Sequence, residues 1–197
     1  PDPNSLGRAG HVRDKDGTFA ALLVAEVAAW AKANGTTIME LLDREIHQDP
    51  DVGLFVTAYE PDPLMGEYPG IEGDRIKLDI LHRTLGYCQL AQAGDLEIGG
   101  HTVYDACVMR TGKYDSIYPP SCDFRLPDEG VRFFFDRDRI SHLTVRPSGT
   151  GNAMRFYLQL YADAPGDELI EEKTRLHREC REILDHLREL LKAPRDR

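Results

Sequence analysis

Positive charge is in short supply in this sequence. It has 24 lysines and arginines against 34 aspartates and glutamates, which gives a formal net charge of −10. A surface this acidic repels the phosphates of nucleic acids and of anionic membranes. We therefore expect neither nucleic acid nor a membrane as a partner.

Cysteine is also scarce, and no long hydrophobic run is present. The cysteines lie far apart with no C-x-x-C pair: Cys88, Cys107, Cys122 and Cys180. This spacing indicates neither a zinc site nor a disulfide framework. Free thiols fit a reducing compartment, and no signal peptide or membrane-spanning run is evident. We expect a cytoplasmic protein.

Familiar catalytic signatures are missing too. The sequence has no Walker loop and no Gly-x-Ser-x-Gly elbow. Its histidines show no paired ligand spacing, and the acidic stretch 72–75 has too few carboxylates for a magnesium site. We expect no metal site in this chain and see no evident nucleophile or general base.

What the chain does have is a loop built from hydrogen-bond donors, at 146–155. It separates two runs that read as strands, 140–145 and 156–161, and no carboxylate interrupts it. Glycines let backbone N–H groups approach a ligand, and arginine presents a fork that matches phosphate oxygens. The residues expected to bind phosphate are Arg146, Ser148, Gly149, Thr150, Asn152 and Arg155.

Two alternatives stay open for this loop. One is an ordinary polar hairpin loop with solvated arginines. The other concerns Asn152, whose side chain can bond its own backbone instead of a ligand. Antiparallel pairing of the flanking strands would bring Arg146 and Arg155 together across the loop mouth.

Periodicity and turn residues predict an α+β fold. The expected helices are 19–33, one opened by a capping box at Thr37, 71–86, and a long one from about 165 to 191. The expected strands are 54–59, 102–109, 131–135, 140–145 and 156–161. From residue 51 the order is β-α-β-β-β-β-α, typical of a two-layer domain with an antiparallel sheet covered on one face by helices. A domain boundary is expected near residue 49.

The helix 19–33 is apolar almost all round, so we expect it to be buried on more than one side. That is unusual near a chain end and suggests packing against a body that is partly missing. The opening Pro1–Asn4, without methionine, looks like a cut. Just before the helix, Lys15 lies between two aspartates, where Asp16 or Thr18 would cap the helix.

The loop and its surroundings resemble the α-D-phosphohexomutases, the superfamily of phosphoglucomutase and phosphomannomutase. Arg146-Pro147-Ser148-Gly149-Thr150 looks like the phosphate-binding loop of that family's last domain. The stretches 11–17, 37–43 and 98–103 resemble, in order, the end of its third domain, the lead into the fourth, and a turn and strand within the fourth. Gly151-Asn152 after the threonine is closer to phosphoglucomutase variants.

The resemblance implies a helical remnant of an α/β third domain at 1–48 and the family's C-terminal, TBP-like domain at 49–197. Such enzymes interconvert hexose 1- and 6-phosphates, glucose phosphates here, through a phosphoserine, a bisphosphate intermediate and Mg²⁺. This chain would grip the phosphate that is not transferred, and Lys15 matches a family lysine near the reacting oxygens. The serine, metal and sugar-recognition segments are not found here, so the chain alone is expected to be inactive. The alternative is a non-catalytic anion-binding or interaction module of the same fold.

Overall fold

A computed structural model describes residues 16–60, 67–110, 129–148 and 151–194. The chain divides into two compact units, 1–53 and 54–197. The division falls a few residues beyond the boundary expected from the sequence. The assignment of the two parts to particular domains stays a prediction.

The first unit is helical. Helix α1 spans Gly17–Ala33, and the Asp16 side chain caps it by accepting from the Phe19 N–H at 2.8 Å. The Thr37 capping box is confirmed: its hydroxyl accepts from the Glu40 N–H, and Glu40 accepts from the Thr37 N–H. It opens α2, Ile38–Leu42, which continues as the π-helical turn η1, Asp43–His47.

Within α1 only Ala31 is buried by the described residues, while Leu22, Val24 and Trp30 are each more than half exposed. The described residues therefore leave most of this apolar helix uncovered. Its packing against a body missing from this chain stays a prediction.

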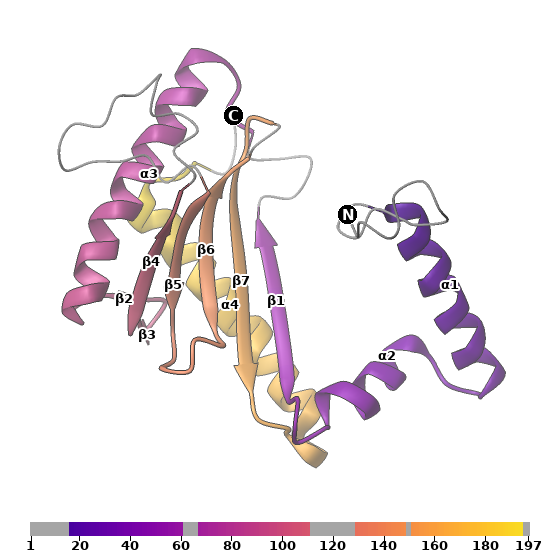
Figure 1. Ribbon diagram of the computed structural model, residues 1–197. Helices are drawn as coiled ribbons and strands as arrows, with labels where there is room; N and C mark the ends of the chain where they lie inside the picture. Colours follow the sequence, from indigo (N-terminus) through magenta and orange to yellow (C-terminus); the bar gives the residue numbers. More distant parts are fainter. Residues whose placement is uncertain (1–15, 61–66, 111–128, 149–150, 195–197) are drawn as a thin grey trace, which may run out of the picture. The chain divides into compact units, whose positions relative to one another are not determined.

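The second unit holds a five-stranded antiparallel sheet in the order β1-β7-β6-β5-β4 (Figure 1). The strands are β1 Leu54–Glu60, β4 Asp105–Met109, β5 Gly130–Phe134, β6 His142–Pro147 and β7 Met154–Ala162. A small ribbon pairs β2, Glu97–Ile98, with β3, His101–Thr102. The helices are α3 Gly70–Ala93, the 3₁₀ turn η2 Gly166–Glu168, and α4 Leu169–Leu191. The predicted α+β class with an antiparallel sheet is thus confirmed.

Both long helices cover the same face of this sheet. Buried and part-exposed residues alternate along β7, so that Met154, Phe156, Leu158 and Leu160 enter the core. Helix α4 packs on β1 and β7, and α3 packs on β4 and β5. Buried residues from α3, α4 and the strands join in one hydrophobic cluster.

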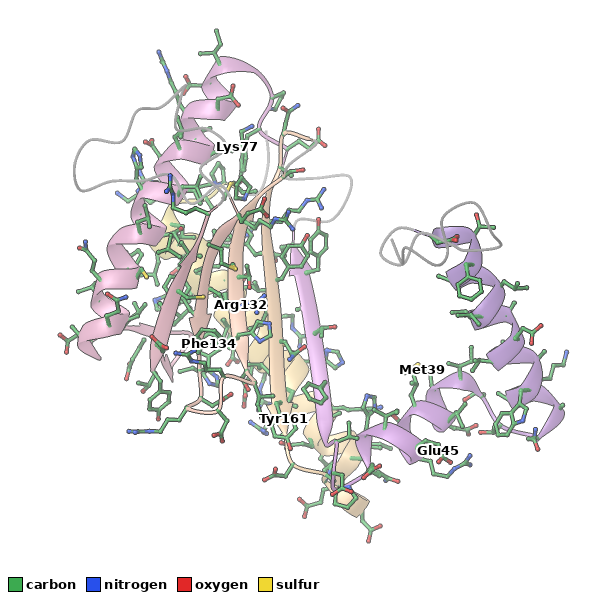
Figure 2. The ribbon with its side chains drawn as sticks, in the orientation of Figure 1. Met39, Glu45, Lys77, Arg132, Phe134 and Tyr161 are labelled. Carbon is green, nitrogen blue, oxygen red and sulfur yellow. The ribbon has the colours of Figure 1, made fainter. Side chains whose placement is uncertain are left out.

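The other face, which we call the open face, is covered by neither α3 nor α4. Arg132, Phe134 and Tyr161 lie on it, with α4 behind the sheet (Figure 2). Neighbouring residues on a strand point to opposite faces of the sheet, so the residues that alternate with the core residues lie on the open face. The open face is therefore where polar side chains of the sheet can meet a ligand.

Two predicted elements differ in extent. Helix α3 runs on to Ala93, where Gly94 ends it in the left-handed conformation. The single strand expected at 102–109 is wrong: the chain pairs first in the β2–β3 ribbon and then, as β4, with β5. The break comes at 103–104, where Val103 donates to the Leu96 carbonyl but Tyr104 donates to that of Phe134. Residues 111–128, between β4 and β5, lie outside the described residues.

Among the described residues, no helix combines the length and the apolar character needed to cross a bilayer.

The turn between β2 and β3 offers a matched test of packing. Gly99 and Gly100 both have positive φ, 59° and 78°, so alanine strains the backbone at either position by about 1–2 kcal/mol. At Gly99 a Cβ would also lie 2.7 Å from the Ile183 Cα of α4, whereas at Gly100 it would meet nothing within 4 Å. We expect Gly99→Ala to lower the free energy of unfolding by about 1–3 kcal/mol more than Gly100→Ala. Urea unfolding followed by circular dichroism measures the difference; equal losses would contradict the close approach.

Candidate anion-binding site

Two arginines face each other across neighbouring strands. Arg146, near the end of β6, is the register partner of Arg155, at the start of β7. The predicted meeting of the two residues at the loop mouth is confirmed. Like charges directly opposite each other on a sheet destabilise it. An anion between the guanidinium groups would remove this repulsion.

Both arginines also carry an unsatisfied donor. The Nε atoms of Arg146 and Arg155 are buried and have no hydrogen-bond partner among the described residues. Buried polar groups are normally satisfied, so each exception needs an explanation. Nε–H is one prong of the fork with which arginine binds an oxyanion. An oxyanion taken up between the strands would give both Nε–H groups an acceptor.

The loop sequence has no carboxylate, but one from another segment of the chain contacts Arg146. Glu129, just before β5, places its Oε2 atom 3.0 Å from Nη2 of Arg146. Both side chains are nearly half exposed, and pairs of this kind contribute only about 0–1 kcal/mol. Glu129 thus offsets part of the charge repulsion without binding Arg146 so strongly that an anion could not replace it.

Gly130, the first residue of β5, leaves room for Arg146. Its φ is 102°, which disfavours any side chain. A Cβ there would lie 2.4 Å from the Val145 carbonyl oxygen and 3.1 Å from the Arg146 Cα. Glycine at this position therefore lets β5 approach the end of β6 closely.

Within the loop, Ser148 can offer an anion only its side chain. Its N–H donates to the Ala153 carbonyl at 2.8 Å, so this group closes the loop. The Ser148 Oγ accepts from the Gly151 N–H at 3.1 Å, so the hydroxyl proton is the donor that Ser148 can offer to an anion. Asn152 is exposed, as binding requires, while Gly149 and Thr150 lie outside the described residues.

The far side of the loop is held by Tyr68, which is 1% exposed. Its N–H donates to the Asn152 carbonyl at 3.0 Å, and Glu67 forms a bridge with Ala153. The Tyr68 hydroxyl donates to the Pro194 carbonyl at 2.5 Å. Burial raises the pKa of Tyr68, so the hydroxyl keeps the proton that it donates. The loop is thus tied to the C-terminal end of α4.

A buried ion pair supports the same region. Arg188 of α4, 7% exposed, donates to Glu60 at the end of β1 and stacks over the Phe156 ring, 5.0 Å from its centroid. Removing one partner of such a pair leaves an uncompensated buried charge. The position of β7, and hence of Arg155, depends on this contact.

Tyr157 is the next residue on the open face after Arg155. Its hydroxyl accepts from Nη1 of Arg155 at 3.4 Å, and this hydrogen bond raises the pKa of Arg155, which keeps the guanidinium charged. Strand alternation could have placed Tyr157 beside Arg155 from sequence. Glu129, Gly130 and Tyr68 could not be found that way, since each depends on the register between distant segments.

The described residues of this arrangement have the donors needed to hold an anion. Within the described ranges no three His, Cys, Asp or Glu residues gather to hold a metal ion. Lys15, predicted from the resemblance to lie near the reacting oxygens, falls outside the described residues.

No protein-family model matches this sequence, and a search of curated proteins finds no match to it. The relation to the phosphohexomutases therefore stays a prediction based on the motifs quoted above.

The Glu129–Arg146 contact gives a directional test. We expect Glu129→Gln to bind inorganic phosphate about two- to fivefold more tightly, because the anion no longer competes with a carboxylate. Isothermal titration calorimetry at constant ionic strength measures the change. The matched control is Glu97→Gln, which removes the same charge from β2, outside the sheet that carries the arginines. Unchanged or weaker binding in Glu129→Gln would show that the carboxylate does not compete.

Proposed function

We propose that this chain is the phosphate-gripping part of a phosphoglucomutase- or phosphomannomutase-type enzyme, with glucose 1- and 6-phosphate as its substrates. In this proposal it binds the phosphate that is not being transferred. The observation that carries the proposal is the pairing of Arg146 with Arg155, each with a buried Nε that has no partner among the described residues. Such a pair is destabilising by itself and is favourable with a phosphate between its members.

The architecture supports the same assignment. A five-stranded antiparallel sheet with helices on one face is compatible with the TBP-like last domain of these enzymes. Residues 49–197 would form that domain, and the helices within 1–48 would belong to the end of the third.

The chemistry would take place on other domains. A phosphoserine and a Mg²⁺ supplied there would transfer the phosphoryl group between the two ends of the hexose. The role of Arg146 and Arg155 would be to fix the distal phosphate, since binding far from the reacting bond orients the substrate for the transfer. Lys15 is proposed as an acid or base near the reacting oxygens.

A non-catalytic anion-binding module of the same fold is the second candidate. The exposure of α1 favours the enzyme, because a stand-alone module would be expected to cover an apolar helix within its own fold. In the enzyme, the remainder of the third domain would cover it.

The proposal is tested by anion binding. We expect glucose 6-phosphate and inorganic phosphate to bind wild type, and Arg146→Ala to weaken both by roughly ten- to a hundredfold, because a charged hydrogen-bonded partner is lost. The matched control is Arg178→Ala, which removes an exposed arginine from α4 and should leave binding unchanged. Equal binding by wild type and Arg146→Ala would overturn the site assignment. Turnover of glucose 1-phosphate by this chain alone would contradict the division of labour.

A further inference from the structure

A pair of tyrosines lies beside the arginines on the open face. Tyr59 of β1 is the register partner of Tyr157 of β7, and their ring centroids lie 5.1 Å apart with the planes tilted by 41°. Tyr59 is 44% exposed, although large aromatic side chains are usually mostly buried. We call these two residues the tyrosine pair.

The tyrosine pair is one step along the strand from the arginine pair. Tyr157 follows Arg155 by two residues, so both side chains project from the open face about 6–7 Å apart. The 3.4 Å contact from Arg155 Nη1 to the Tyr157 hydroxyl joins the two pairs. A ligand whose phosphate lies between Arg146 and Arg155 therefore has the tyrosine pair within reach of its remaining atoms.

The next residues in the same row of the sheet are polar. Tyr157 pairs with Thr144 on β6, and Thr144 pairs with Arg132 on β5. Nε of Arg132 donates to the Thr144 hydroxyl at 2.9 Å, and the guanidinium group has further donors (Arg132 is labelled in Figure 2). Aromatic faces beside hydrogen-bond donors suit a ligand with an apolar face and a polar rim. A hexose ring has both, since its C–H groups form the face and its hydroxyls the rim.

We infer that the tyrosine pair is the ring-binding subsite for the hexose of a phosphosugar whose phosphate is held by Arg146 and Arg155. This rests on the proposed function, because it needs the arginine pair to bind the phosphate. The ring-binding subsite would distinguish ligands that the arginine pair alone binds equally well. The arginines recognise any phosphate, whereas the tyrosines select phosphates attached to a ring.

The experiment compares two ligands on each protein. Glucose 6-phosphate and inorganic phosphate are titrated into the full chain, and the ratio of their affinities is the readout. We expect wild type to prefer glucose 6-phosphate, and Tyr59→Ala to reduce that preference about three- to tenfold with little change in phosphate affinity. Tyr59→Phe should keep most of the preference, because the aromatic face remains.

The matched control is Tyr104→Ala. Tyr104 is 49% exposed and likewise lies near an arginine, with the Arg137 guanidinium 5.5 Å from its ring centroid, but it is not on the row beside the arginine pair. We expect it to leave the preference unchanged. Saturation-transfer NMR gives an independent readout: the sugar C–H protons should receive saturation from tyrosine ring protons in wild type and lose it in Tyr59→Ala.

The possible failures can be told apart. A preference that survives in Tyr59→Ala, with phosphate binding intact, overturns the ring subsite and leaves the phosphate site standing. An absence of phosphate binding in folded wild type overturns the proposed function and the ring subsite together. If Tyr59→Ala proves unfolded by circular dichroism, the saturation transfer in wild type and Tyr59→Phe decides: no transfer to the sugar in either protein overturns the inference.

Discussion

The register between β6 and β7 is the constraint on which the site depends. Side chains alternate along a strand, so a slip of one residue would send Arg155 into the core and Phe156 onto the open face. The apolar residues of β7 prevent this, because Met154, Phe156 and Leu158 are completely or almost completely buried. Burial on one face of the sheet thereby fixes the position of charge on the other. The opposition of two arginines, unfavourable by itself, is maintained by the core.

The end of α4 holds this arrangement in place at the loop. Arg188 is buried, yet its charge is paired with Glu60 and its guanidinium contacts the Phe156 ring. Tyr68 bonds the loop through its N–H and the residue after α4 through its hydroxyl. Contacts between segments far apart in the sequence thus support one short hairpin loop. A substitution near Pro194 would therefore change the position of the loop through Tyr68, although Pro194 itself lies outside the loop.

Local chemistry explains what could be predicted from sequence. The capping box at Thr37, the strand β7 and the long helix α4 are set by residues close together in the chain, and each was predicted. The facing of Arg146 and Arg155 follows from one hairpin. By contrast, the contact of Glu129 with Arg146 depends on the register between β5 and β6. The break between β3 and β4 depends on which strand each of them pairs with, β2 or β5. The apolar composition of α1 shows that the helix needs a partner surface, but it does not show which part of a protein supplies that surface.

The contact of Glu129 with Arg146 has a consequence for which anions the site can accept. The site already contains one negative charge of its own, held at 3.0 Å. A singly charged anion such as chloride would exchange one negative partner for another and gain little. A phosphate dianion brings more charge and reaches both arginines at once, so it gains over the resident carboxylate. A phosphate dianion would therefore displace Glu129 from Arg146 more readily than chloride would.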